Sequence, residues 1–146
     1  MAIARPVDRR LFFMLDRAHT RLTKAADNHL AGTVDISSSQ AAVLTYLGYH
    51  DNCRLTELAD GVGRNNSAIT GLVTRMETAG LVQRDKGTSD RRAKTVSLTN
   101  AGWVMRETVM NEFRDFNEQL AKGMSASEMD AVMKFLNLAA DNVKTS

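Results

Sequence analysis

Hydrophobic residues recur at helical spacing along the first third of the chain. An apolar stripe with intervals of three to five residues predicts a long helix over about 7–31, which Gly32 ends. Ser37 and Gln40 then stand at the spacing of a capping box, in which each side chain bonds the backbone amide of the other residue. Because further apolar positions follow this pair, we expect a second helix over about 38–50.

The same signals occur towards the C-terminal end. Thr99 is expected to cap a long helix that continues to about Lys122. Ser125 and Glu128 have the spacing of another capping box, which predicts a last helix. The apolar face expected on that helix consists of Met129, Val132, Met133, Leu136, Ala140 and Val143.

Two shorter helices are predicted in the middle of the chain. Thr56 is expected to cap the first, and Gly61 and Gly63 mark its end. Asn65 or Asn66 is a suitable N-cap for the second. Two helices joined by so short a turn indicate a helix-turn-helix. The buried face expected on its second helix consists of Ile69, Leu72, Val73 and Met76.

Alternating apolar residues over 81–84 and 94–98 predict a pair of short strands. The sequence therefore predicts a mainly α (α+β) fold: a winged helix-turn-helix over about 37–100 with a two-stranded β wing, flanked by terminal helices over about 7–31 and 100–143. Because the terminal helices lie far in sequence from this central unit, they have little core of their own chain to cover. We expect them to be dimerisation helices, with one domain over residues 1–146.

Composition places the chain among ordinary globular proteins. It has 146 residues, of which 43% are hydrophobic and 25% are charged. The single cysteine, Cys53, excludes an intramolecular disulfide framework and fits a reducing compartment. No apolar run approaches the roughly 20 residues that span a bilayer. We expect a cytoplasmic protein without a cofactor.

Positive charge is concentrated in one segment of the chain. The formal net charge is only +2, yet residues 84–94 contain five basic and two acidic side chains, a balance of +3. The tip of this segment, 87–89, carries only Gly, Thr and Ser. A slim basic loop suits the minor groove of DNA, about 6 Å wide, while a helix fits the major groove, about 12 Å wide. This arrangement indicates double-stranded DNA as a partner.

An ordered set of motifs over about 50 residues resembles the MarR family of bacterial transcriptional regulators. The set comprises LTELA (55–59), SAIT (67–70), VTRMETAGLVQR (73–84), DRR (90–92) and VSLTNAG (96–102). The resemblance implies a homodimeric, sequence-specific DNA-binding regulator, most often a repressor, acting on pseudo-palindromic operators. The long terminal helices fit the dimerisation region of the family, so the resemblance covers nearly the whole chain.

The resemblance also implies which residues contact DNA. In the wing, Arg92 enters the minor groove, Asp90 orients it through a charge-assisted hydrogen bond, and Arg91 contacts a phosphate. The matching outward positions of the recognition helix are Asn66, Ser67, Thr70 and Arg75, and further candidates for phosphate contacts are Thr56 and Lys86. The chain departs from the family at Gly71, where many members carry an arginine.

Members of this family accept small aromatic or phenolic effectors between the dimerisation helices and the winged helix. The resemblance suggests Phe12, Phe13, His19 and Trp103 as ligand-binding residues. The competing interpretation assigns the same side chains to an ordinary core.

Three other functions compete with the regulator. A non-sequence-specific architectural protein would use the same basic segment. His50 and Cys53 invite a metal or redox interpretation, but two further nearby ligands are missing, so we expect no metal and a buried, structural Cys53. An enzyme would need a nucleophile with its base, paired carboxylates or a phosphate-cradling loop, and the sequence shows none of these patterns.

Overall fold

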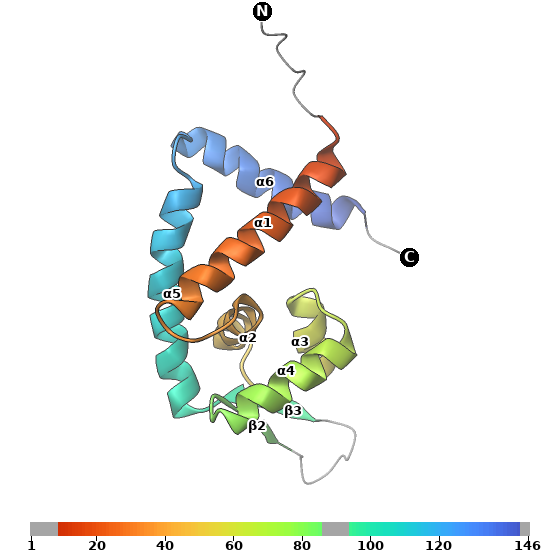
Figure 1. Ribbon diagram of the computed structural model, residues 1–146. Coiled ribbons are helices and arrows are strands. Elements are labelled where there is room, and N and C mark those ends of the chain that lie inside the picture. The colour runs from red at the N-terminus through yellow and green to blue at the C-terminus, as the bar shows by residue number, and fades with distance from the viewer. Residues whose placement is uncertain (1–8, 86–93, 144–146) are drawn as a thin grey trace, which may run out of the picture. The chain divides into compact units, whose positions relative to one another are not determined.

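The computed structural model describes residues 9–85 and 94–143 (Figure 1). Within these residues the elements follow in the order α1 (Leu11–Ala31), α2 (Ser38–Tyr49), β1 (Cys53–Arg54), α3 (Leu55–Gly61), α4 (Asn66–Thr78), β2 (Val82–Asp85), β3 (Thr95–Leu98), α5 (Asn100–Leu120) and α6 (Ala126–Asn142). The mainly α winged-helix fold predicted from the sequence is confirmed.

The chain divides into two compact units, one up to Glu112 and the other from Phe113 onwards, so the boundary falls inside α5. The first unit contains the helix-turn-helix and the sheet, and the second contains the end of α5 and α6. A single domain over the whole chain stays a prediction.

The two capping boxes are confirmed. In α2 the Ser37 hydroxyl accepts the amide hydrogen of Gln40 at 3.1 Å, and the Gln40 side chain accepts that of Ser37 at 3.0 Å. In α6 the Glu128 amide donates to the Ser125 hydroxyl at 3.2 Å, and the Ser125 amide donates to the Glu128 carboxylate at 3.0 Å. Each box satisfies two amides that a helix start leaves without intrahelical partners.

The predicted start of α1 is wrong by four residues. The helix begins at Leu11 rather than at about residue 7, because Arg10 has a non-helical backbone and makes no side-chain cap. Its predicted end is confirmed, since Gly32 is the C-cap.

The prediction that Thr56 caps α3 is also wrong. The N-cap is Arg54, two residues earlier, so the helix begins at Leu55, and the backbone of Arg54 is extended. Arg54 is extended because it lies in β1, a two-residue strand that pairs antiparallel with β3 through Cys53 and Val96. The sheet therefore has three strands, in the order β1-β3-β2, where the sequence predicted two.

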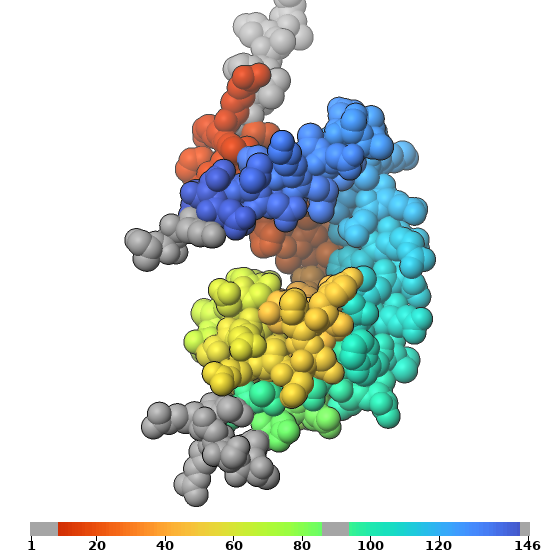
Figure 2. Space-filling view, turned by 180° about the vertical axis from the view of Figure 1, so that it is seen from behind, coloured from red at the N-terminus to blue at the C-terminus, as the bar shows by residue number. Residues whose placement is uncertain are grey.

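Apolar side chains from the helices and strands of the first unit meet in one core. Figure 2 shows the α2 segment, in amber, against the first half of α5, in teal. Each large apolar side chain buried in this way contributes about 1.5–3 kcal/mol. The fully buried members are Leu30, Val43, Leu44, Leu47, Leu58, Ile69, Val73, Met76, Val82, Val96 and Val109. Because all four predicted apolar residues of α4 are buried, its polar face is held outward.

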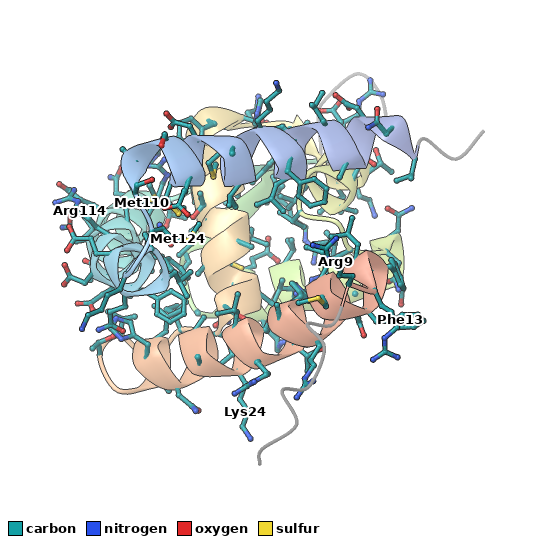
Figure 3. All side chains as sticks on the ribbon, turned by 90° about the horizontal axis from the view of Figure 1, so that it is seen from above. Arg9, Phe13, Lys24, Met110, Arg114 and Met124 are labelled. Atoms are coloured by element: carbon teal, nitrogen blue, oxygen red, sulfur yellow. The ribbon has the colours of Figure 1, made fainter. Side chains whose placement is uncertain are left out.

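Several apolar side chains of the terminal helices remain exposed. Phe12 is 75% exposed and Phe13 62%, and Figure 3 shows Phe13 projecting outward from α1. On α6 none of the residues is buried. The exposed large apolar residues of these two helices are Leu11, Phe12, Phe13, Met14, Leu15 and Leu22 on α1, and Val132, Met133, Phe135, Leu136 and Leu138 on α6. Among the described residues, no helix is both long and apolar enough to cross a membrane.

Candidate nucleic-acid interface

The turn between α3 and α4 sets where the second helix begins. Gly63 adopts a φ of +67°, a left-handed conformation that glycine reaches without a Cβ penalty. Asn65 then caps α4, because its side-chain oxygen accepts the Ala68 amide hydrogen at 2.7 Å. Of the two asparagines that the sequence offered, Asn65 is therefore the cap, and Asn66 is the first helical residue.

The outward face of α4 carries short polar side chains. The predicted contact residues Asn66, Ser67, Thr70 and Arg75 are all exposed there. The Thr70 hydroxyl donates its hydrogen to the Asn66 carbonyl at 2.8 Å, so towards a partner its oxygen can act as a hydrogen-bond acceptor. A short, rigid polar face of this kind lets the helix backbone approach base edges in a major groove.

Arg75 lies back along α4 beside Gly71. A Cβ built on Gly71 would stand 3.6 Å from Nη1 of Arg75, at ordinary contact distance. Many members of the resembled family carry an arginine at the position of Gly71. In this chain the guanidinium of Arg75, one helical turn later, lies beside that position. Among residues 9–85 and 94–143 the guanidinium of Arg75 makes no hydrogen bond or ion pair.

Arg84 joins the sheet to the recognition helix. From β2, its Nη2 donates to the hydroxyl of Thr74 and, at 3.4 Å, to the carbonyl of Thr70. Its backbone amide donates to the carboxylate of Glu77 at 3.1 Å. Three residues of α4 are therefore held by one residue at the base of the hairpin, which fixes the strand beside the exposed face of the helix.

The predicted wing residues Lys86, Asp90, Arg91 and Arg92 lie outside the described residues. The strands on either side of them are paired, with Asp85 opposite Thr95. The remaining candidate for a phosphate contact, Thr56, is exposed on α3.

Cys53 is a buried residue of β1, 7% exposed, as the sequence suggested. Burial raises the pKa of its thiol, and the negative charge of Glu57 raises this pKa further. His50 ends α2 and its ring stacks on Tyr46, with centroids 4.6 Å apart. Within the described part of the chain, no group of three or more His, Cys, Asp or Glu residues could hold a metal ion.

The predicted ligand residues have different surroundings. Phe12 and Phe13 are exposed on α1 and contact each other edge to face, so the alternative that assigned them to the core is wrong. His19 is exposed on the same helix. Trp103, on α5, instead lies beside Arg106, whose guanidinium carbon is 5.9 Å from the ring centroid.

An apolar cavity of about 440 Å³ lies beside the start of α5. None of the four predicted ligand residues lines it. Sequence reasoning missed this cavity because its walls come from segments that only the fold brings together. The lining residues are Val34, Leu81, Asn100, Ala101, Val104, Met105 and Thr108.

Comparison with known proteins agrees with this geometry. A sequence model described as the MarR family matches residues 36–94. The chain is 31% identical over 115 residues to the uncharacterised HTH-type transcriptional regulator YfiV of Bacillus subtilis, covering 76% of this chain and 71% of that protein. It is 25% identical to the HTH-type transcriptional repressor IacR of Pseudomonas putida, over 92% of this chain and 80% of that one. The S. aureus MepR–DNA complex shares the fold, with a TM-score of 0.83 at 20% identity, over 94% of this chain and 100% of that one.

Proposed function

The chain belongs to the MarR family of DNA-binding transcriptional regulators, and we propose that it acts as a homodimeric, sequence-specific repressor of pseudo-palindromic operators. The observation that carries this proposal is the outward face of α4. Its polar side chains are exposed while its apolar side chains are locked into the core, so a major groove can receive the helix without any rearrangement of the fold.

Two recognition helices are needed to read a pseudo-palindrome. In a symmetric dimer they meet half-sites about one helical turn of DNA apart, about 34–36 Å. The exposed large apolar side chains of α1 and α6 support a second copy of this chain as their partner, because groups of exposed apolar side chains are typical of association surfaces. Repression as the sign of regulation is supported by the similarity to a protein described as a repressor.

The wing completes the proposed interface. Arg92 inserts into the minor groove next to the site that α4 reads, with Asp90 as its positioning partner, and Arg91 and Lys86 contact phosphates. The pairing of β2 with β3 supports this role, since the two strands extend to Asp85 and Thr95 on either side of the segment that carries these charges.

A small aromatic or phenolic effector releases the repressor in this proposal. The cavity beside α5 is a second candidate for the effector-binding site, as an alternative to the site predicted from the α1 residues and Trp103. Its apolar walls suit an aromatic ring, and its position beside the first turns of α5 would allow a bound ligand to shift the population of DNA-binding conformations.

Selection of duplexes from a random pool, followed by titration, tests the proposed function. We expect binding to a selected inverted repeat to exceed binding to a scrambled duplex by at least about 10³-fold at physiological salt. Size-exclusion chromatography with light scattering should give the mass of two chains. Equal affinity for the two duplexes would instead establish the architectural alternative, and a monomer on DNA would contradict the dimer.

A further inference from the structure

A small hollow lies beside the recognition helix, between α4, the turn before it and the start of α2. It has a volume of about 150 Å³ and is lined by Ser39, Arg64, Ala68, Leu72 and Arg75. We propose that this hollow seats one backbone phosphate of bound DNA, held by the guanidinium groups of Arg64 and Arg75. The inference rests on the proposed DNA-binding function and assigns to that function a contact outside the wing.

The charges that line the hollow have one sign. Arg64 and Arg75 are both exposed, and no carboxylate belongs to the lining. Arg64 donates to the Ser39 hydroxyl at 3.2 Å, which directs its guanidinium towards α2. Two guanidinium groups at one hollow repel each other until an anion enters, and phosphate oxygens accept hydrogen bonds from both groups at once.

The first turn of α2 adds a donor at the same place. Its amides are satisfied on either side of Ser39: the Ser38 amide donates to the Asp27 carboxylate at 2.6 Å, and the Gln40 amide donates to the Ser37 hydroxyl at 3.1 Å. The amide of Ser39 has no partner among the described residues. An open amide in the first turn of a helix favours an anion, because the helix dipole is positive there.

The helix face beneath the hollow explains why the arginines can share it. Ala68, Leu72 and Arg75 lie on one side of α4, and the small side chain of Ala68 leaves room above the helix. Gly71, next to this row, lies beside the guanidinium of Arg75, since a Cβ built there would stand 3.6 Å from its Nη1. A phosphate held here would fix the register of α4 on the duplex, which is the usual role of phosphate contacts.

The first experiment measures how DNA affinity depends on salt. Arg64→Gln, Arg75→Gln and the double variant are compared with the parent on the selected inverted repeat and on a scrambled duplex. We expect each single change to weaken binding by about tenfold, equally on both duplexes. In the double variant, the slope of log affinity against log salt should fall by about 0.9 per protomer, the value for one phosphate. Lys24→Gln, which removes an equal charge from an exposed position that points away from the protein in Figure 3, should leave the slope unchanged.

The second experiment identifies the phosphate. Duplexes carrying a single methylphosphonate, which removes one backbone charge, are tested position by position. One position in each half-site should weaken the parent and leave the double variant unaffected. If every such substitution weakens the parent and the double variant equally, the hollow holds no phosphate. If Arg75→Gln abolishes discrimination between the duplexes without changing the slope, Arg75 reads a base and the proposal is overturned. Failure of the parent itself to prefer the inverted repeat would reject the proposed function instead.

Discussion

The guanidinium of Arg84 in β2 donates a hydrogen bond to the hydroxyl of Thr74 on α4, ten residues earlier in the chain. The Thr74 hydroxyl in turn donates to the Thr70 carbonyl at 2.8 Å. A side chain of the sheet is therefore hydrogen-bonded to α4, and the opposite face of this helix is buried in the core. This link ties the direction of the hairpin to the direction of the recognition helix.

We predict that the Arg84–Thr74 link is a measurable coupling. Arg84→Met keeps most of the aliphatic stem and removes the guanidinium, and Thr74→Val removes the hydroxyl. The coupling energy of the double-mutant cycle should be about 0.5–1.5 kcal/mol in urea unfolding at a fixed protein concentration. Additivity within about 0.3 kcal/mol would show that the two side chains do not stabilise each other.

The wing assignment predicts a large effect at one arginine. Arg92→Ala should weaken binding to the selected inverted repeat by several-fold or more, because it removes the cation from the minor groove. The dimer should persist in size-exclusion chromatography. Lys24→Gln serves as the charge-matched control, and an unchanged affinity of Arg92→Ala at physiological salt would contradict the assignment.

Two glycines should differ in how much stability the same substitution costs. A Cβ on Gly102 would overlap the carbonyl oxygen of Leu81, which already accepts the Thr99 amide hydrogen at 3.1 Å and cannot move freely. A Cβ on Gly48 would meet only the flexible end of Arg106. We expect Gly102→Ala to cost about 1–3 kcal/mol. Gly48→Ala should change stability little, because alanine favours the helix by about 1 kcal/mol and Arg106 can swing away.

Thermal unfolding of the two variants at equal concentration checks this contrast. An equal loss of stability would show that Arg106 is as rigid as the backbone at Leu81. A stable Gly102→Ala variant would show that α5 can shift away from the strand.

Local sequence patterns correctly predicted those helix starts that depend only on residues a few positions apart. Ser37 with Gln40, and Ser125 with Glu128, depend only on residues three positions apart, and both boxes form. The strand β1 was missed because its two residues pair with β3, more than 40 residues away. That pairing extends Arg54 and moves the start of α3, so the error at the cap followed from the missed strand.

The candidate site likewise has one part that local sequence predicts and another part that only the folded chain creates. The outward positions of α4 follow from helical periodicity, and they are exposed as predicted. The hollow at Arg64 was not predicted, because Ser39 and Arg75 meet there only after the helices pack. Exposure of Phe12 and Phe13 could not be read from their apolar character, since periodicity cannot tell a core from a surface that a second copy covers.

Cys53 is predicted to be chemically inert at neutral pH. Burial holds the pKa of its thiol above the ordinary value, so little reactive thiolate is present. Alkylation by iodoacetamide should be slow at pH 7 and should accelerate only as the pH rises through that elevated pKa. Peroxide treatment should leave DNA affinity unchanged, and Cys53→Ser should bind DNA like the parent. A peroxide-dependent loss of affinity that Cys53→Ser abolishes would restore the redox-sensor hypothesis.

The capping box of α6 contains the carboxyl group of Glu128, whereas that of α2 contains the amide group of Gln40, so only the α6 box should respond to acid. Hydrogen bonds from Ser125 lower the pKa of Glu128 below its ordinary 4.5. A carboxyl with a lower pKa in the folded state stabilises that state above the unfolded pKa, and this contribution disappears as the pH falls through the folded pKa. The helix content of α6, followed by backbone NMR shifts, should decrease below about pH 4.5 in the parent. Glu128→Gln turns this box into the neutral type that Gln40 forms on α2, so the acid-dependent loss at α6 should vanish while α2 stays unchanged. If α6 loses helix equally in both proteins, groups other than Glu128 govern its response to acid.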